Sequence, residues 1–397
     1  MTYYKSNHSE VARTLAQTLR QFIDTHIIPV EAELARSGES SPLMTQLNSM
    51  AREAGLWGLF YPLSHGGKIA SLEDYLLVAE QEGRTEFSQT IFGSHSALDA
   101  HMIVNFGSEA LQQQFLQPLA KGLAVSAYGM TEPDHGGSFP SLISTSAQLA
   151  NGQWTINGRK WFVCNTDRAT FVTVLARTGA ANVPINQALS MIIVPTSTAG
   201  FKVERQISLL GRHLGQGEMS FTNVQVPEQY LLGDCGAGIA LMGQRLNTGR
   251  LLRSMNWVGL AQRCCELMGA RIHSQRGVSS RFLDKQLVRQ HLVTAHHAIS
   301  SARELIRLAA RGVDAGHSNN VDINMAKMAA SQAICTASDS AMQLYGAEGV
   351  SELTPIEGIY RIARTSRILD GSDEALISSV GRKLMDYYQD GGYYHFD

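Results

Sequence analysis

The stretch TSAQLANGQWTING, residues 145–158, decides the fold class of this chain. Apolar and polar residues alternate on both sides of Asn151–Gly152, and an Asn-Gly pair between two such runs is typical of a two-residue β-hairpin turn. A second pair, Asn157–Gly158, is expected to redirect the chain after the hairpin. The 397-residue chain therefore contains β structure near its middle.

Alternation with a period of two continues on both sides of this hairpin, in short runs between about Leu123 and Gly236 that Gly, Asn and Pro separate. These runs predict a β-barrel or a β-sandwich. Before and after them, apolar residues recur three and four positions apart, which indicates helices with one buried face. We therefore expect a mainly α protein with a central β domain: an N-terminal helical bundle (residues 1–122), the β domain (123–236) and a C-terminal four-helix bundle (237–397).

The composition argues against several classes of function. A formal net charge of −2 without a dense Lys/Arg run does not favour nucleic acid or an anionic membrane. No apolar run reaches the roughly 18 residues that a membrane span needs, and the first residues do not form a signal-peptide pattern. The cysteines and histidines lack metal-ligand spacing. We expect small-molecule partners and further copies of this chain, no metal, and a cytoplasmic location.

An acidic residue near the C-terminus, Asp370, raises a question of its own. It lies in RILDGSDEALISSVG, residues 367–381, between an apolar pair and a glycine. Asp is among the best N-cap residues, and the segment that follows has the acidic first turn and the apolar period of a helix. Judged locally, the segment favours a helix cap. The alternative is a carboxylate that takes a proton from a substrate.

Five motifs, in the same order and at near-identical spacing, resemble signature stretches of the acyl-CoA dehydrogenase family. The resemblance covers essentially the whole chain, and it implies FAD-dependent α,β-dehydrogenation of an acyl-CoA thioester within fatty acid metabolism. The motifs are YGMTEPDHGGS (128–138), NGRKWFVCN (157–165), GLAQR (259–263), QLYGAEGVSELTPIEGIYRIART (343–365) and ILDGSDE (368–374).

The first two motifs correspond to the flavin-binding stretches of that family. By the resemblance, Met130, Thr131 and Ser138 serve the flavin and the nearby substrate. The Thr131 hydroxyl and nearby backbone N–H groups can meet the polar pyrimidine edge of the ring, where negative charge accumulates on reduction. Phe162 aligns with the usual ring-facing Trp, and Cys164 aligns with the usual Thr. Backbone contacts would survive the second change, whereas a hydroxyl contact would not.

Each of these assignments has a structural alternative. A turn hydroxyl is the alternative for Thr131, although its neighbours favour the flavin role. Trp161, next to the ring-facing position, is more typical of a core residue than of a cofactor contact.

The third and fourth motifs imply a cofactor site that a second subunit completes, in a homodimer or homotetramer. The family binds the pyrophosphate and adenine of FAD with an arginine after the GLAQR helix and with the Gln-Gly turn of another subunit. Gln343 and Gly346 fit that turn, and Arg276 is the best match for the arginine, with Arg281 as the alternative. A solvated arginine at a helix end is the competing interpretation of either. Ser372 is a further expected cofactor contact.

The fifth motif places Asp370 on the catalytic position of the family. Most relatives carry Glu there, and this chain resembles a branch that carries Asp, which includes bacterial proteins and mammalian members fused to kinase-like domains. By the resemblance, Asp370 removes the α-proton, and the β-hydride passes to N5 of the flavin. Arg250 supports the catalytic loop, while Gly249 rules out a base at the position that some branches use instead. An electron-transfer flavoprotein is the expected acceptor.

Three alternatives stay open. Nitroalkane oxidases resemble these dehydrogenases and also use an aspartate base, so a flavin oxidase is one. A dehydrogenase acting on acyl-carrier-protein thioesters is the second, and a helical scaffold that has lost its flavin is the third. The length and branching of the acyl group cannot be derived from these motifs.

Overall fold

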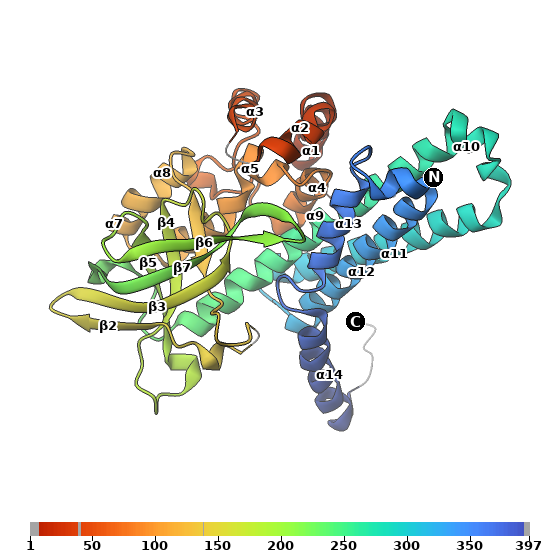
Figure 1. The fold of residues 1–397 in the computed structure, drawn as a ribbon. Coiled ribbons are helices and arrows are strands. Elements are labelled where there is room, and N and C mark those ends of the chain that lie inside the picture. Colours follow the sequence, from red (N-terminus) through yellow and green to blue (C-terminus); the bar gives the residue numbers. More distant parts are fainter. Residues whose placement is uncertain (1–7, 39–40, 138, 393–397) are drawn as a thin grey trace. The chain divides into compact units, whose positions relative to one another are not determined.

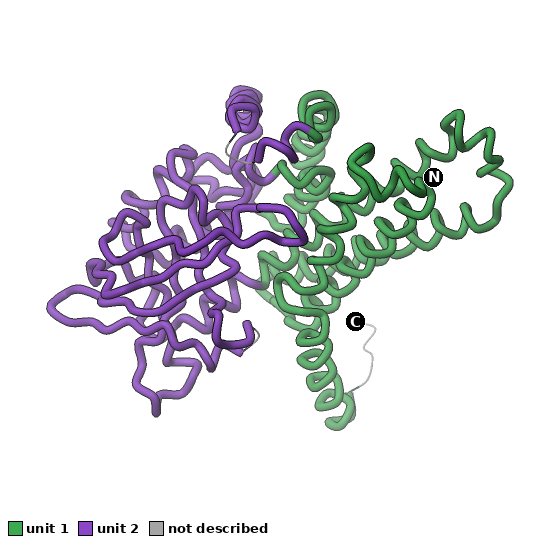
Figure 2. The backbone as a smooth tube through the Cα atoms, in the orientation of Figure 1, with its two compact units in different colours: residues 1–32, 71–88, 247–397 green, residues 33–70, 89–246 purple. Residues whose placement is uncertain are grey.

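The computed structural model describes residues 8–38, 41–137 and 139–392 (Figure 1). Contacts divide the chain into two compact units, each assembled from separated stretches (Figure 2). Unit 1 comprises residues 1–32, 71–88 and 247–397, and unit 2 comprises residues 33–70 and 89–246. The sequence-based boundaries, which follow chain order, stay a prediction.

Unit 2 contains a sheet of eight strands in the order β6-β7-β3-β2-β4-β5-β8, with β1 paired to β4 in parallel. The strands are β1 (Ser126–Gly129), β2 (Ser146–Ala150), β3 (Gln153–Val163), β4 (Phe171–Arg177), β5 (Leu189–Pro195), β6 (Phe201–Leu209), β7 (Arg212–Pro227) and β8 (Leu231–Leu232). The helices wholly within this unit are α3 (Pro42–Glu53), α6 (Ala97–Phe106), α7 (Glu109–Leu111) and α8 (Gln117–Ala120).

Strands β4 and β5 form the core of the sheet because they are buried along almost their whole length. Their sequences, FVTVLAR and LSMIIVP, are nearly continuous apolar runs, as expected for strands covered on both faces. The ring of Phe115 packs edge-on against Phe171 of β4, with 5.1 Å between the ring centroids. The apolar residues of β4 and β5 therefore form the core of the sheet, against which Phe115 packs, and β4 also pairs with β1.

The hairpin predicted from the first Asn-Gly pair is confirmed. Strands β2 and β3 pair antiparallel, and both Asn151 (φ 52°) and Gly152 (φ 72°) adopt the left-handed conformation that a two-residue turn requires.

The expectation for the second Asn-Gly pair is wrong, because β3 continues through Asn157–Gly158 to Val163. The pair instead forms a bulge against β7, where the Asn157 side-chain oxygen accepts a hydrogen bond from the Asn223 N–H at 2.8 Å. A Cβ atom at Gly158 would come within 2.5 Å of the Thr145 hydroxyl oxygen, so the glycine permits a close approach of chains.

Unit 1 is helical. The long helix α11 buries Ala295, Ile299, Ala302 and Ile306, a spacing of three and four residues that makes one apolar face, and this face packs on the alanine-rich α12. Helix α12 also contacts α13 and α14. The helices of this unit are α1 (Glu10–Phe22), α4 (Leu72–Glu82), α10 (Gln275–Ser279), α11 (Gln286–Asp314), α12 (Asn320–Tyr345), α13 (Ile356–Ser366) and α14 (Asp373–Gln389).

Three further helices, α2 (Glu31–Ser37), α5 (Ser88–Phe92) and α9 (Gly238–His273), have residues in both units. The fold class is as predicted, with a helical N-terminal region, a β region and a helical C-terminal region. Among the described residues, no helix combines the length and the apolar character that a membrane crossing needs.

The arginine of the GLAQR motif has a structural role in unit 1. Two Arg263 nitrogens donate to the Glu31 carboxylate at 2.8 and 2.6 Å, and one also donates to the Arg84 carbonyl at 2.8 Å. Both side chains of the ion pair are largely buried, 6% and 14% exposed. Arg263 therefore ties α9 to the first and second stretches of this unit.

We expect Arg263→Met to lower the free energy of unfolding by about 3–5 kcal/mol, because it leaves the largely buried Glu31 carboxylate without its charged partner. Denaturant unfolding of the purified protein measures this effect. As a control, Lys202→Met removes a pair that is 68% and 34% exposed, and it should change the free energy by less than about 1 kcal/mol. Equal effects of the two substitutions would contradict the assignment.

Candidate active site

The chain segment that follows β1 is fixed to β3 by a pair of hydrogen bonds. The Thr131 hydroxyl donates to the Trp161 carbonyl at 2.6 Å, and the Trp161 N–H donates to the Thr131 carbonyl at 3.0 Å. Because the hydroxyl proton is used within the protein, Thr131 can offer a ligand only an acceptor lone pair. Stabilisation of negative charge at a pyrimidine edge would need it to donate instead.

The same segment is supported from within the sheet by a buried ion pair that the sequence did not reveal. Lys160 is fully buried, and its ammonium donates to the Met130 carbonyl and to Glu132 Oε1, both at 2.9 Å. The Glu132 carboxylate also accepts from the N–H groups of Ser144 (2.8 Å) and Thr145 (2.9 Å). Every partner in this cluster lies within unit 2.

The environment decides the charge of both members of this pair. Burial alone would raise the pKa of Glu132, but the Lys160 charge and the hydrogen bonds from Lys160, Thr145 and Ser144 lower it to about 2. Burial lowers the pKa of Lys160 to about 8, against the attraction of Glu132. At neutral pH the pair is therefore ionised.

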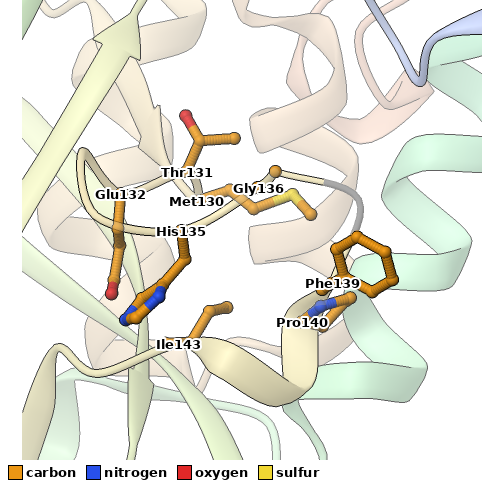
Figure 3. A pocket seen from close by; sticks show the side chains of 9 residues that line it. Met130, Thr131, Glu132, His135, Gly136, Phe139, Pro140 and Ile143 are labelled. Carbon is orange, nitrogen blue, oxygen red and sulfur yellow. The ribbon is translucent and has the colours of Figure 1, made fainter.

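A small pocket lies beside this segment (Figure 3). Figure 3 shows the His135 and Phe139 side chains on the loop that continues from it. The pocket is lined by Met130, Thr131, Glu132, His135, Gly136, Gly137, Phe139, Pro140 and Ile143. Ser138, which the sequence assigned to the cofactor, lies outside the described residues.

Phe162 has an unusual backbone conformation for an aromatic residue. Its φ is 49°, in the left-handed region, and it lies where the pairing of β3 with β7 shifts between Lys160 and Val163. The side chain is 43% exposed, and its ring packs edge-on against Trp161 at 4.9 Å. Trp161 is only half-buried, so its interpretation as a core residue is wrong. The bulge turns the Phe162 ring outward, where a ligand can reach it.

Cys164, two residues further along, is exposed. Its sulfur lies 3.7 Å from the amide nitrogen of Gln216, which donates to it. The other polar atom of that side chain, Gln216 Oε1, is buried and has no hydrogen-bond partner among the described residues. An acceptor left without a partner is costly, so this atom favours a donor that the protein alone does not supply.

The structure answers the question that Asp370 raised, because Ser372, not Asp370, is the N-cap of α14. The Ser372 hydroxyl accepts from the Ala375 N–H at 3.3 Å. Asp370 lies two residues earlier, in a left-handed conformation with φ 57°, and Gly371 follows with φ 97°. The helix-cap interpretation of Asp370 is therefore wrong, and its carboxylate is available for another role.

Arg250 supports this turn from α9. Its Nε donates to the Asp370 backbone carbonyl at 2.8 Å, and one of its terminal nitrogens donates to Asn324 Oδ1 at 3.3 Å. Burial lowers the pKa of Arg250, and the charge of Asp370 opposes that shift. The Asp370 side chain is 28% exposed, and its Oδ2 lies 3.9 Å from Nε of Arg253.

A second cation holds the next carbonyl of the same turn. Lys327 of α12 is fully buried, and its ammonium donates to the Gly371 carbonyl and to Asp373 Oδ1, both at 2.8 Å. The Ser331 hydroxyl contacts both Asp373 oxygens, at 3.1 and 3.0 Å. The motifs do not predict this group, although the lone lysine in the apolar and small-residue run NMAKMAASQ is a signal for it.

The C-terminal end of α12 brings the predicted adenine-site residues into one neighbourhood. Gln343 and Gly346 are both exposed, and Gly346 has φ 65°. Arg276 forms an ion pair with Glu348, and Arg271 contacts the other oxygen of that carboxylate at 3.0 Å.

Arg276 and the segment after the turn are joined within one chain through Glu348, which the motifs did not point to. The contribution of a second subunit to this site stays a prediction. The alternative, Arg281, instead pairs with Asp284 at 2.9 Å and is 79% exposed. Among the residues that the structure covers, no cluster of three or more His, Cys, Asp and Glu could hold a metal ion.

Comparison with known proteins decides the family. Models of the N-terminal, middle and C-terminal domains of acyl-CoA dehydrogenases match residues 9–123, 127–224 and 236–385. This chain belongs to the acyl-CoA dehydrogenase family. Within the family it is 32% identical over 384 residues to acyl-CoA dehydrogenase family member 11 of Rattus norvegicus, covering 92% of this chain and 49% of that protein.

A bacterial relative matches over nearly its whole length. FadE2 of Mycobacterium tuberculosis, described as a probable acyl-CoA dehydrogenase, is 31% identical over 383 residues, which are 92% of this chain and 93% of that protein. The chain spans about half the length of the family member 11 proteins.

Solved structures agree with this assignment. A probable acyl-CoA dehydrogenase from Mycobacterium abscessus has a TM-score of 0.86 at 26% identity, covering 95% of this chain and 99% of that one. The glutaryl-coenzyme A dehydrogenase in complex with glutaryl-CoA has a TM-score of 0.86 at 25% identity, covering 99% and 100%.

Members of the acyl-CoA dehydrogenase family are FAD-dependent oxidoreductases, and FAD is the cofactor, as predicted. The residues after β1 and on β3 fit this group. The outward ring of Phe162 offers an apolar face, Thr131 offers an acceptor, and the buried Gln216 Oε1 lacks a donor. Cys164 fits less well, because a thiol is a weaker hydrogen-bonding group than the hydroxyl usual in the family.

We expect the Lys160–Glu132 pair to make the stability of this protein sensitive to acid. The pKa of Glu132 is lowered from 4.5 to about 2, so the carboxylate contributes about 3 kcal/mol above pH 4.5. That contribution is lost as the pH falls toward 2. Glu132→Gln should therefore lower the unfolding midpoint at pH 7, and the gap from the wild type should shrink between pH 4.5 and pH 3.

Thermal unfolding of the holoprotein at a series of pH values measures this gap. Glu204→Gln, which changes an exposed carboxylate paired with Lys202, is the control and should shift the midpoint little at any pH. A gap between wild type and Glu132→Gln that stays constant down to pH 3 would show that the ionised carboxylate is not what matters.

Proposed function

We propose that this chain catalyses the FAD-dependent α,β-dehydrogenation of an acyl-CoA thioester, with Asp370 as the base that removes the α-proton. The proposal rests on the conformation and the hydrogen bonds of the turn that contains Asp370. Its carboxylate does not cap α14, and its backbone carbonyl accepts a hydrogen bond from the half-buried Arg250. The Asp at this position also supports assignment to the branch that uses Asp in place of Glu.

The carboxylate has the access that a general base needs. The Arg253 guanidinium stands 3.9 Å from Oδ2, too far for a hydrogen bond, so this contact does not occupy the lone pair that would take the proton. The side chain is partly exposed, so a substrate can reach it without the backbone moving. Asp is one methylene shorter than Glu, and the loop must therefore stand about 1 Å closer to the substrate to keep the proton-transfer distance.

An α-proton of a thioester is weakly acidic, so the base needs help from hydrogen bonds to the thioester oxygen. In the proposed mechanism the Asp370 backbone N–H supplies one of them, stabilising the charge that develops when the α-proton leaves. Arg250 acts through the backbone, because its bond to the Asp370 carbonyl holds the turn that carries this N–H. FAD, when bound, supplies the acceptor for the hydride that leaves the β-carbon.

The remaining assignments are part of the same proposal. Met130, Thr131, Phe162 and Cys164 would face the flavin end of FAD. Arg276, Gln343, Gly346 and Ser372 would serve other parts of the cofactor, in a homodimer or homotetramer. An electron-transfer flavoprotein is the proposed acceptor of the electrons, and fatty acid metabolism is the proposed setting.

We expect Asp370→Asn to slow flavin bleaching by an acyl-CoA about 10²–10⁴-fold, because the amide cannot accept the α-proton. Asp370→Glu should retain part of the rate, since it keeps the carboxylate and changes only its reach. Anaerobic titration of the purified holoprotein with a panel of acyl-CoAs, followed by flavin absorbance, gives these rates. Asp386→Asn on the exposed surface of α14 is the matched control and should bleach like the wild type.

Two results would contradict the proposal. Wild-type rates in Asp370→Asn would remove Asp370 from the chemistry. Turnover of substrate under air, at full rate and without an added electron acceptor, would favour a flavin oxidase over a dehydrogenase.

A further inference from the structure

We infer that Lys327 is a positioning residue for the base, acting through the peptide groups that follow Asp370. This inference rests on the proposed function of Asp370. Lys327 comes from the N-terminal third of α12, 43 residues before the base in the sequence, and its side chain is fully buried. It touches the turn at Gly371 and at Asp373, but it does not touch the Asp370 carboxylate itself.

Two cations fix two consecutive peptide groups of the turn. Arg250 donates to the carbonyl of Asp370, and Lys327 donates to the carbonyl of Gly371, each at 2.8 Å. Because a peptide group is planar, a bond to its oxygen constrains the orientation of the whole plane. Fixing both planes holds the backbone between them in the left-handed conformation that Gly371 adopts, and this sets the direction in which Asp370 leaves the turn.

The turn is also tied to the helices on both sides. Before it, the Leu369 N–H donates to the Thr365 carbonyl at 3.0 Å at the end of α13. After it, Asp373 opens α14, where its buried carboxylate takes the Lys327 bond. The Lys327 ammonium therefore contacts both the turn and α14.

Burying the Lys327 ammonium costs desolvation free energy, so we asked which of its contacts an apolar side chain could not replace. Asp373 neutralises Lys327 and is itself satisfied by Ser331 and by Arg367, whose Nε lies at 3.5 Å. Buried ion pairs of this kind often contribute little net stability compared with apolar residues of the same size. An apolar pair could join α12 to α14 equally well, but it could not hold the Gly371 carbonyl. That carbonyl contact is what distinguishes a positioning role from a purely structural one.

Positioning by Lys327 is important because the Asp370 side chain is shorter than that of Glu. A misplacement of about 1 Å can cost about 10²-fold in rate, and an Asp has one rotatable bond fewer than Glu with which to correct it. The position of the Asp370 backbone therefore translates directly into the position of its carboxylate.

The test compares Lys327→Met with the double variant Lys327→Met/Asp373→Leu in the holoprotein. The double variant removes both buried charges, so its unfolding midpoint should return toward the wild type, while its flavin-bleaching rate should stay roughly 10–100-fold below it. The dissociation constant for the acyl-CoA should change less than about threefold in both, because the fully buried Lys327 side chain has no surface to offer a substrate. Amide hydrogen exchange in residues 367–373 should be faster in both variants.

Arg303→Met is the matched control in the same unit. It breaks an ion pair with Glu80 at 2.7 Å on α11, away from the Asp370 turn. It should lower the unfolding midpoint without changing the bleaching rate or the exchange of residues 367–373.

Recovery of the wild-type bleaching rate together with stability in the double variant would overturn the inference, because Lys327 would then be structural only. A wild-type rate in a folded Lys327→Met protein would overturn it equally. If no acyl thioester bleaches the wild type, the proposed function fails instead, and hydrogen exchange alone judges Lys327. Slow, wild-type exchange of residues 367–373 in Lys327→Met would then refute the positioning role.

Discussion

The candidate site depends on hydrogen bonds from buried lysine ammonium groups to backbone carbonyls. In unit 1, Lys327 donates to the Gly371 carbonyl and to the Asp373 carboxylate. In unit 2, Lys160 donates to the Met130 carbonyl and to the Glu132 carboxylate. Each carboxylate follows its carbonyl by two residues, so both loops are held by the same arrangement. A buried ammonium restricts the position of the backbone carbonyl to which it donates, because the charge cannot move into water. The segments that we propose to contact substrate and flavin each contain such a carbonyl.

The two loops also share strained backbone beside these fixed points. Phe162 follows Lys160 by two residues, and Asp370 precedes Gly371, and both adopt positive φ, which is uncommon for residues other than glycine. Such conformations cost free energy and persist only where the surroundings determine them. Phe162 lies at the irregularity of β3, and Asp370 lies in the turn before α14, so an aromatic ring and a carboxylate stand beside the segments that the buried lysines hold.

Much of the fold could be predicted from the sequence, because it depends on local patterns. Asn151–Gly152 dictates a turn whatever surrounds it, and the apolar period of α11 reflects one buried face. Asn157–Gly158 misled for a physical reason. The same dipeptide forms a bulge when a neighbouring strand, here β7, continues the pairing, and a single strand does not reveal its neighbour.

The site was predictable only in part. Asp370 could be assigned a role only through the resemblance, because its local sequence is equally that of a helix cap, and the choice of Ser372 as the cap depends on two backbone angles. Lys160 and Lys327 were missed because their partners lie 28 and 46 residues away in the sequence. Nothing in the spacing of such residues identifies which carbonyl a lysine will reach. The carboxylate of Glu348 between Arg271 and Arg276 has a further consequence for anions. It acts as an internal counter-ion that keeps the guanidinium groups oriented. A pyrophosphate that bound these arginines, as proposed, would compete with this carboxylate, so part of its binding free energy would offset the loss of a counter-ion that the chain itself provides.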